Sequence, residues 1–449
     1  MNFTRYNAGV KWKTPPFDIR LLIVSMLIFF SFWYWARHVY IPANASEVRA
    51  RRLPVGNNSD LYPRWLGARE LLLHGRDPYS SEITREIQTG FYGRPLDPEN
   101  KTDPRAQEAF VYPLWVVLLV APTVTLKFAS AITIFRWILV GSIGLSAMLW
   151  MNLMGSRLRP LLVCSVVLFV FSSLPFLVEY YQQNLTAAVI LFVALSAFCV
   201  ARRQLILGGF FLAVATMKPD TTGLLILWLL IWAVARWRDR QRMLWSFAAT
   251  LTGLFAVSET LLPHWIGRFI AGIREYPTYG TAPNVSQLVF TPVLGTVISL
   301  FLVLLLVVLW FLWRTEAATS PQFRWSLAWT CIVTLAIIPK IAFYNQLLLI
   351  PPLLALSTEY RNIQKDRVVL RALASAPFAC LLLHWLMAMV LSMASMLGQG
   401  SLILFFTPEL PDHIFLAVAP LTLIAVVSVG FFSSVTGSLS NLRSVGEAT

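Results

Sequence analysis

The chain has 449 residues, of which 57% are hydrophobic and only 13% are charged, and its mean hydropathy is +0.66. This composition excludes an ordinary soluble protein and predicts an all-α, polytopic integral membrane protein. The net charge of +14 does not require nucleic acid, because lysines and arginines in loops beside anionic lipid give the same balance. We therefore expect membrane lipids, and no nucleic acid, as partners.

The first apolar segment covers residues 19–36 and follows a basic start. The triplet Ala43-Asn44-Ala45 resembles a signal-peptidase site, so a cleaved signal is one interpretation. Trp33, Trp35 and Tyr40 instead follow the pattern of an interfacial aromatic belt. The belt favours a retained signal anchor with its N-terminus inside.

A long polar loop, residues 42–110, separates this anchor from the next apolar segment. It carries an apolar run at 71–73 together with Trp65, Phe91 and Tyr92, so we expect helices folded against the membrane surface. Asp60 precedes a plausible helix through Leu73, which makes it a candidate N-cap. A functional role for Asp60 is compatible with capping, and the sequence leaves both open.

Further apolar segments follow the loop, near 111–126, 131–152, 160–178, 185–201, 205–217, 221–235, 243–262, 293–313, 325–338, 343–358, 372–397 and 414–433. Basic residues cluster in alternate connections, at 202–203, 236–242, 314–324 and 361–371, which predicts that these lie inside. Upstream of residue 185 there is one apolar segment too many for this alternation of inside and outside connections. We expect 160–178, interrupted by Ser172, Ser173 and Pro175, not to span. About twelve spans and two cytoplasmic termini remain.

The chain reads as a single integral-membrane domain over 1–449, with a first span at 19–36, the outer loop at 42–110, a core at 111–358 and C-terminal spans at 359–449. All four cysteines lie inside apolar segments without metal-ligand spacing. We therefore expect packed thiols, no metal and no cofactor.

Several polar groups fall on the predicted outer side of the membrane. A lysine between apolar runs is costly in a membrane and usually faces a cavity or a partner, or else reaches the interface. Lys218 and Lys340 both stand in such positions. The outer-side groups are Asp60 with Arg64 and Arg69, Glu179 to Asn184, Lys218 to Asp220, the segment 263–292, and Lys340 to Gln346.

The order of several short motifs resembles glycosyltransferase family 87, whose members are integral-membrane enzymes of GT-C type. The motifs are an Asp after the first span, Ala-Arg-x-Leu-Leu-Leu-x-Gly-x-Asp-Pro-Tyr at 68–79, Tyr112-Pro113, Gln182-Gln183-Asn184, and Gly-Gly-x-x-Leu-Ala-x-Ala-x-x-Lys-Pro at 208–219. The resemblance runs from about residue 19 to 358. Tyr181 and the segment 343–346 depart from the common family pattern, which leaves the sugar and the acceptor open.

The resemblance implies a polyprenyl-phosphate sugar donor, typically of mannose, and a catalytic Asp at position 60. The expected reaction is inverting and metal-independent. A carboxylate base activates the acceptor hydroxyl, and a cation stabilises the leaving phosphate. Lys218, Arg64 and Lys340 are the expected phosphate ligands. The expected sugar or acceptor ligands are Gln183, Asn184, Tyr79, Tyr344 and Asn345.

The expected acceptor is a lipid-linked or cell-envelope glycan, on the outer face of an inner or plasma membrane. One alternative is a transporter or flippase with Lys218 and Lys340 along its substrate path. A second is an oligosaccharide ligase or polymerase. A transporter predicts ionisable groups on both sides of a mid-membrane site, whereas the candidates here gather on one side.

Overall fold

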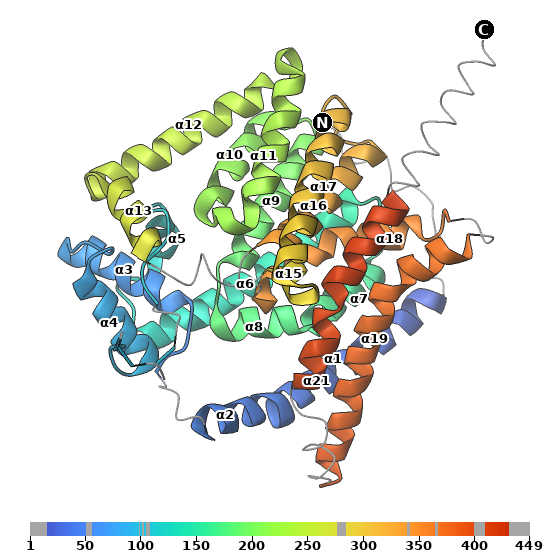
Figure 1. The fold of residues 1–449 in the computed structure, drawn as a ribbon, viewed down its shortest axis with the longest axis horizontal. Coiled ribbons are helices and arrows are strands. Elements are labelled where there is room, and N and C mark those ends of the chain that lie inside the picture. Colours follow the sequence, from blue (N-terminus) through green and yellow to red (C-terminus); the bar gives the residue numbers. More distant parts are fainter. Residues whose placement is uncertain are drawn as a thin grey trace.

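The computed structural model of the protein describes residues 16–50, 56–97, 99–100, 103–104, 108–275, 284–338, 342–363, 367–398 and 409–430. Every regular element within these residues is a helix or helical turn, as Figure 1 shows. The predicted all-α class is therefore confirmed. Lys340 lies outside the described residues.

The long loop after the first apolar segment, and the segment that follows it, hold short helices. α1 (Pro16–Trp35) continues through a π-helical turn, η1 (Ala36–Tyr40), into α2 (Ile41–Ala50). The next elements are α3 (Leu61–His74), α4 (Ser81–Tyr92), α5 (Val116–Val120) and the 3-10 turn η2 (Ala121–Thr123). The loop thus contains helices, as predicted, and their position against the membrane surface stays a prediction.

The rest of the chain forms a helical body. Its first part comprises α6 (Phe128–Leu153), α7 (Pro160–Phe171), α8 (Leu174–Gln182), α9 (Thr186–Ala201), α10 (Leu205–Val214), η3 (Ala215–Met217), α11 (Pro219–Ala235), α12 (Trp237–Leu261) and α13 (Trp265–Glu275). Its second part comprises α15 (Val285–Val289), α16 (Pro292–Trp313), α17 (Pro321–Ile337), η4 (Phe343–Leu349), α18 (Ile350–Glu359), α19 (Val368–Met396), α21 (Glu409–Leu416) and a helix over 418–430.

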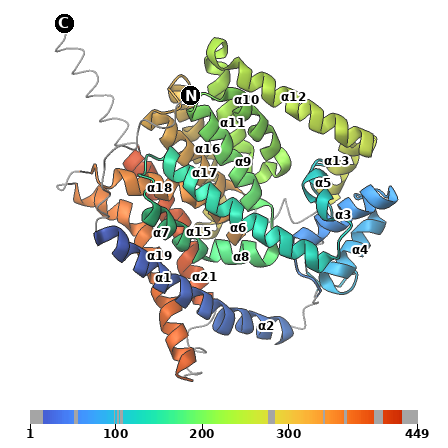
Figure 2. The ribbon, with the colours of Figure 1, turned by 180° about the vertical axis from the view of Figure 1, so that it is seen from behind.

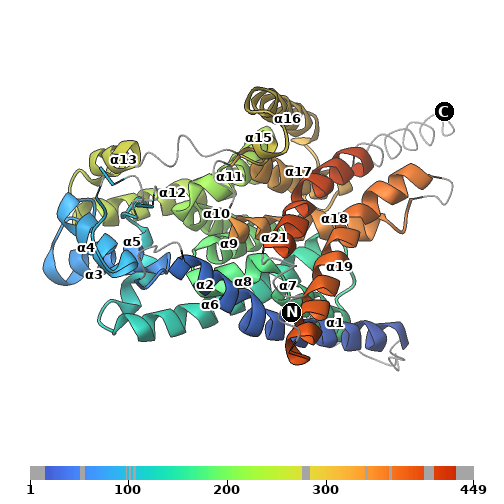
Figure 3. The same ribbon diagram turned by 60° about the horizontal axis from the view of Figure 1, so that its bottom comes forward.

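A lobe made of α3, α4, α5, η2 and α13 stands at one end of the body (Figure 3). It has its own apolar core, in which Leu61, Ile83, Phe110 and Trp265 are buried. Phe128, at the start of α6, packs on Tyr62 and Trp65 of α3. From there α6 crosses the body, passing in front of α9 and beside α8 in the view of Figure 2. The outer loop is therefore a folded unit joined to the body.

The body has two ends, which α17 and α18 connect. The start of α17 at Pro321 and the end of α18 at Glu359 line one cavity together with Asp18 of α1 and Arg157. At the other end, η4 brings Asn345 next to Lys218. Seventeen residues of α17 extend about 25 Å at 1.5 Å per residue. We call the two ends the Arg157 end and the Asp60 end.

The membrane spans agree only in part with the prediction. Among the described residues, six helices are long and apolar enough to cross a membrane, or seven if a bent pair counts as one span. Three shorter apolar segments, Thr186–Ala201, Leu205–Met217 and Pro219–Ala235, accompany them. The protein is therefore multi-pass, but a total of twelve spans is not confirmed.

The interruption expected at Ser172 and Ser173 is present, because α7 and α8 meet there at a bend of 67°. The start of α7 and the end of α8 lie far apart in the fold. Arg159, before α7, pairs with Asp18 at 3.1 Å, whereas the Gln182 carbonyl, ending α8, accepts from the Asp60 N–H at 2.7 Å. The pair thus connects the two ends of the body. This geometry favours a broken span, against the expectation that 160–178 does not cross.

Segment 111–126 does not have the form of a helical span. Its α-helix, α5, has only five residues, far fewer than the roughly twenty that a helical span needs. The segment wraps α3, where Trp65 donates to the Thr123 carbonyl at 3.1 Å and Arg69 to the Val124 carbonyl at 2.8 Å. Reading 111–126 as a span was therefore wrong, because its apolar side chains fill the core of the lobe.

Candidate active site

The polar candidates meet where four segments converge at the Asp60 end. These segments are the start of α3, the turn after α8, the break before α11, and η4. Asn184 joins them, since its Nδ2 donates to Oδ2 of Asp60 at 2.7 Å while its Oδ1 accepts from Nζ of Lys218 at 2.9 Å. One amide thus connects a carboxylate and an ammonium that stand 158 positions apart in sequence.

Asp60 occupies the N-cap position of α3, but its side chain makes no capping hydrogen bond. Ser59 takes up that local role, since its hydroxyl accepts from the Leu61 N–H at 3.3 Å. The Asp60 backbone is fixed by its bond to Gln182, and its carboxylate turns toward Asn184. The capping interpretation of this side chain is wrong. Asp60 as a whole residue is half-buried, whereas Asn184 and Lys218 are buried.

The turn after α8 depends on Gln183, which ends the helix with a φ of 51°. This left-handed conformation is uncommon for a residue other than glycine. Two bonds hold it, because the Gln183 amide accepts from Ser59 at 2.7 Å and donates to the Tyr180 carbonyl. Gln183 is fully buried. Its side chain therefore fastens α8 to the start of α3, and a contact with sugar stays a prediction.

Lys218 lies in the gap between η3 and α11, where Pro219 opens the second helix without an N–H to bond backward. Its ammonium donates to Asn184 at 2.9 Å, Thr186 at 2.6 Å and Asn345 at 3.2 Å. The Tyr344 ring centroid lies 4.7 Å from Nζ. Because a lysine has three donors, these partners satisfy the ammonium within the protein. Lys218, Asn184 and Asn345 are all buried.

Arg64 and Tyr79 belong to the support of the lobe. Arg64 is fully buried and donates to the Asp60 carbonyl and the Tyr112 hydroxyl, both at 2.5 Å. Tyr79 donates to the Tyr112 carbonyl at 2.7 Å. Burial, and to a lesser degree Asp77, raises the pKa of Tyr79, which keeps the hydroxyl protonated as a donor. Arg64 therefore positions the Asp60 backbone, and contacts of either residue with substrate stay predictions.

Two groups at this site had no role assigned from the sequence, although Glu179 was among the polar groups expected on the outer side. Thr186 bonds both Asn184 and Lys218, at 2.9 and 2.6 Å. Glu179 is fully buried, with Oε1 accepting from the Ala187 N–H at 3.1 Å and Oε2 without a hydrogen-bond partner. Glu179 lies within electrostatic reach of Lys218, Asp60 and Arg64. The sequence signal for both is their placement within seven residues of one turn, 179–186.

The described residues contain no group of three or more His, Cys, Asp or Glu side chains arranged to hold a metal ion. Transfer without a metal stays a prediction. The site brings together the carboxylate of half-buried Asp60 and the carboxylate of buried Glu179. It also holds two buried cations, Lys218 and Arg64, and is surrounded by amides and hydroxyls. Such a set can accept a proton from a hydroxyl and stabilise negative charge.

Residues 110–339, just over half of the chain, match the model of glycosyltransferase family 87. The chain belongs to glycosyltransferase family 87. This family 87 protein is accordingly a membrane glycosyltransferase, which takes a sugar from a donor and passes it to a glycan or lipid acceptor. No curated protein matches the chain. The matched range includes Asn184 and Lys218 but begins after Asp60, so the link between Asp60 and the family region rests on geometry.

Proposed function

We propose that this family 87 transferase moves mannose or another hexose from a polyprenyl-phosphate donor to a lipid-linked or cell-envelope glycan, with Asp60 as the general base. The observation that carries the proposal is the bridge from Asp60 through Asn184 to Lys218. It places the carboxylate of half-buried Asp60 against residues of the family-matched region.

The proposed reaction is a single displacement at the anomeric carbon. The acceptor oxygen forms a bond to C1 of the sugar while the bond from C1 to the phosphate oxygen breaks. The polyprenyl phosphate leaves with that electron pair, and Asp60 takes the proton of the acceptor hydroxyl. Attack from the face opposite the phosphate inverts the anomeric centre. No metal is needed if protein cations stabilise the leaving phosphate.

The geometry supports a positioning role for Lys218 ahead of direct phosphate binding. Its three donors are already used by Asn184, Thr186 and Asn345, so a phosphate would have to displace one of them. While it is so held, the ammonium fixes the Asn184 carbonyl, and with it the orientation of the amide that donates to Asp60. Direct phosphate binding by Lys218 is therefore the alternative role, which requires the phosphate to displace one of these three acceptors.

We further propose that the Asp60 end faces the outside of an inner or plasma membrane, with both termini cytoplasmic. The distribution of basic residues supports this orientation, because Arg157, Arg159, Arg324 and Arg361 line the cavity at the opposite end. The transporter alternative receives less support. The polar network gathers at one end of the body, and the family match concerns transferases.

The proposal is tested by incubating the purified full-length protein with radiolabelled polyprenyl-phosphate mannose and crude lipid and glycan acceptors. We expect label to move into an acceptor in proportion to protein and time. Transport without transfer, measured as donor crossing a vesicle without any labelled product, would instead support the alternative. A parallel reaction with polyprenyl-phosphate glucose distinguishes the sugar.

A further inference from the structure

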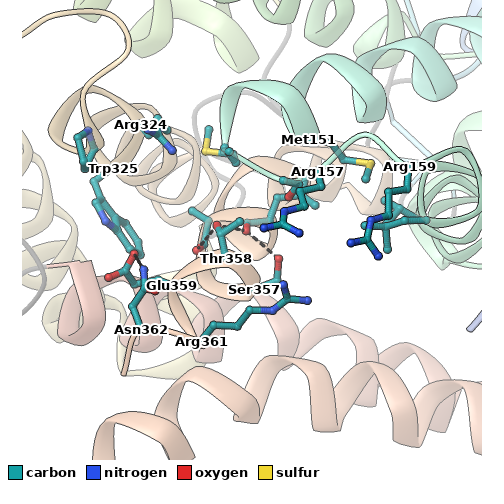
Figure 4. Close-up of a pocket in the computed structure, with 18 of the residues that line it drawn as sticks. Met151, Arg157, Arg159, Arg324, Trp325, Ser357, Thr358, Glu359, Arg361 and Asn362 are labelled. Carbon is teal, nitrogen blue, oxygen red and sulfur yellow. Dashed lines mark hydrogen bonds between the residues drawn. The ribbon is translucent and has the colours of Figure 1, made fainter. Parts of the chain in front are cut away.

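A cavity of about 590 Å³ opens at the Arg157 end and plays no part in the proposed reaction. Figure 4 shows the side chains around it. Four arginines line it, and the two acidic residues in its wall are Asp18 and Glu359. Asp18 is committed to Arg159 at 3.1 Å, and Glu359 accepts from Asn362 at 3.4 Å. The arginines outnumber the carboxylates by two, so we call it the arginine cavity.

Arg157 and Arg361 are the arginines available to a ligand. They come from different elements, Arg157 from the connection between α6 and α7 and Arg361 from the turn after α18. Both are exposed, and the described residues offer neither guanidinium an ion-pair or hydrogen-bond partner. In Figure 4 both extend toward Ser357. Two guanidinium groups that converge without carboxylates suit a phosphate, which accepts paired N–H bonds.

A second, almost wholly apolar cavity of about 290 Å³ adjoins the first. The two share Val166, Leu354 and Ser357 in their walls. The apolar cavity continues between α7, α18 and α19, past Phe169, Phe378 and Trp385. A ligand that occupies both cavities would therefore carry charge at one end and an apolar group at the other. Inorganic phosphate or a sugar phosphate would leave the apolar part unfilled.

We propose that the arginine cavity binds the phosphate of an anionic phospholipid from the membrane leaflet at the Arg157 end, with one acyl chain in the adjoining apolar cavity. Cationic pockets between membrane helices are suited to such headgroups. The site joins α1, α6, α7, α17 and α18 at their ends. Bound lipid therefore stabilises the packing of the body at the end away from Asp60. The proposal does not depend on the transfer reaction.

The test measures binding of phosphatidylglycerol to delipidated full-length protein in detergent, by the rise in melting temperature with lipid concentration. Phosphatidylcholine with the same chains supplies the neutral comparison, and inorganic phosphate with glycerol 3-phosphate supplies the headgroup without a chain. We expect only phosphatidylglycerol to stabilise the wild type strongly. Equal stabilisation by phosphatidylcholine, or by the soluble phosphates, would overturn the assignment.

Two variants locate the site. The double variant Arg157→Gln/Arg361→Gln should bind phosphatidylglycerol at least about tenfold more weakly. The loss of a single charge-assisted hydrogen bond already lowers an affinity by about that factor. Arg238→Gln/Arg242→Gln is the matched control, since it removes two exposed arginines of α12 at the same end but outside this cavity. Val166→Phe keeps every arginine but narrows the passage between the two cavities, so it should also weaken binding of the lipid. An equal loss in the α12 control contradicts a specific site, as does unchanged binding by the Arg157/Arg361 variant.

Discussion

Asn184 carries the most demanding contacts in the site, because the two ends of one amide serve partners of opposite charge. Its Nδ2 can only donate and its Oδ1 can only accept, which suits a carboxylate on one side and an ammonium on the other. Buried polar groups left without partners cost about 1–3 kcal/mol each. The orientation of the Asp60 carboxylate is therefore set by a residue that stands 124 positions later in the chain.

We expect Asn184→Ala to reduce the turnover of transfer by about 10²-fold, since small misplacement of a catalytic group has costs of that size. The donor KM should change little, because Asp60 and Lys218 both remain. Asn152→Ala, at the far end of α6, is the control and should keep wild-type kinetics. Steady-state kinetics on folded, purified variants measure both parameters. Full activity of Asn184→Ala would remove the bridge from the mechanism.

Lys218→Met separates the two roles of the ammonium. If Lys218 mainly positions Asn184, turnover falls by about 10²-fold with an unchanged donor KM, and Lys218→Arg does not restore it, because a planar fork cannot reproduce three converging bonds. We expect this pattern, together with a lower melting temperature. A donor KM raised at least about tenfold, with partial rescue by arginine, would instead assign Lys218 to the phosphate.

Sequence alone found part of this site for a clear physical reason. Asn184, Lys218 and Asn345 are polar groups in or beside apolar segments, where burial is costly and needs an explanation. Asp60 lies in the polar loop, and the resemblance to family 87 singled it out. Thr186 was not singled out, and Glu179 was expected on the outer side without a role, because a threonine at a helix start and a glutamate near a predicted interface have ordinary structural explanations. Which atoms bond to which depended on the left-handed turn at Gln183, and residue type does not announce that conformation.

At the scale of elements, α10 packs closely because of its two glycines. A Cβ on Gly209 would stand 2.2 Å from the Met243 carbonyl oxygen of α12, and one on Gly208 would stand 2.9 Å from a Val200 methyl of α9. Ser196 of α9 donates to the Gly208 carbonyl at 2.8 Å, which fixes the same approach. The Gly-Gly pair nine residues before Lys218 is therefore a packing device that sets the position of the break at Lys218.

Gly209→Ala should lower the melting temperature and the yield of folded protein, because an added methyl has to push against backbone. Overpacking of this kind costs about 1–3 kcal/mol. Gly223→Ala in α11 is the control, since nothing lies within 4 Å of its added Cβ and alanine favours helix by up to about 1 kcal/mol. Thermal unfolding in one detergent compares them. Similar melting temperatures for the two variants would show that α10 and α12 do not pack as described.

At the scale of the whole molecule, the path of the chain corrects the assignment made from apolar runs. Segment 111–126 is as apolar as a span but folds into the lobe, and the interrupted pair α7–α8 connects the two ends. Arg157 and Arg159 carry a sequence signal for this arrangement, because basic residues between 153 and 159 favour an inside connection. Hydropathy could not distinguish a segment that fills the core of the lobe from a segment that spans the membrane, because the two are equally apolar.

Introduced cysteines distinguish the two topologies in a background where the native cysteines are replaced by serine. Lys127→Cys, exposed at the start of α6, should react with an impermeant maleimide from outside. Gln241→Cys should not react, and Ser80→Cys should. If 111–126 crosses the membrane, Lys127→Cys is protected until the membrane is opened. That result would restore the assignment from apolar runs and contradict the fold described for the lobe.

The class of the fold was predictable from composition, because a chain this apolar can satisfy its backbone in a membrane only with helices or a closed barrel. The family was predictable from the order of its short motifs and is confirmed by the match over 110–339. The number of spans was not, because α9, α10 and α11 are apolar but shorter than a full span. The proposed role of Lys340 stays a prediction outside the described residues.

The most direct test of Asp60 as the base compares wild type with Asp60→Asn in the radiolabelled polyprenyl-phosphate mannose assay, at matched amounts of folded protein. Asparagine keeps the shape and still accepts from Asn184 through its carbonyl, but it cannot take a proton from the acceptor. We predict that transfer falls by about 10²- to 10⁴-fold while the melting temperature and donor binding stay near wild type. Near-normal turnover by Asp60→Asn would contradict the assignment of Asp60 and the site built around it.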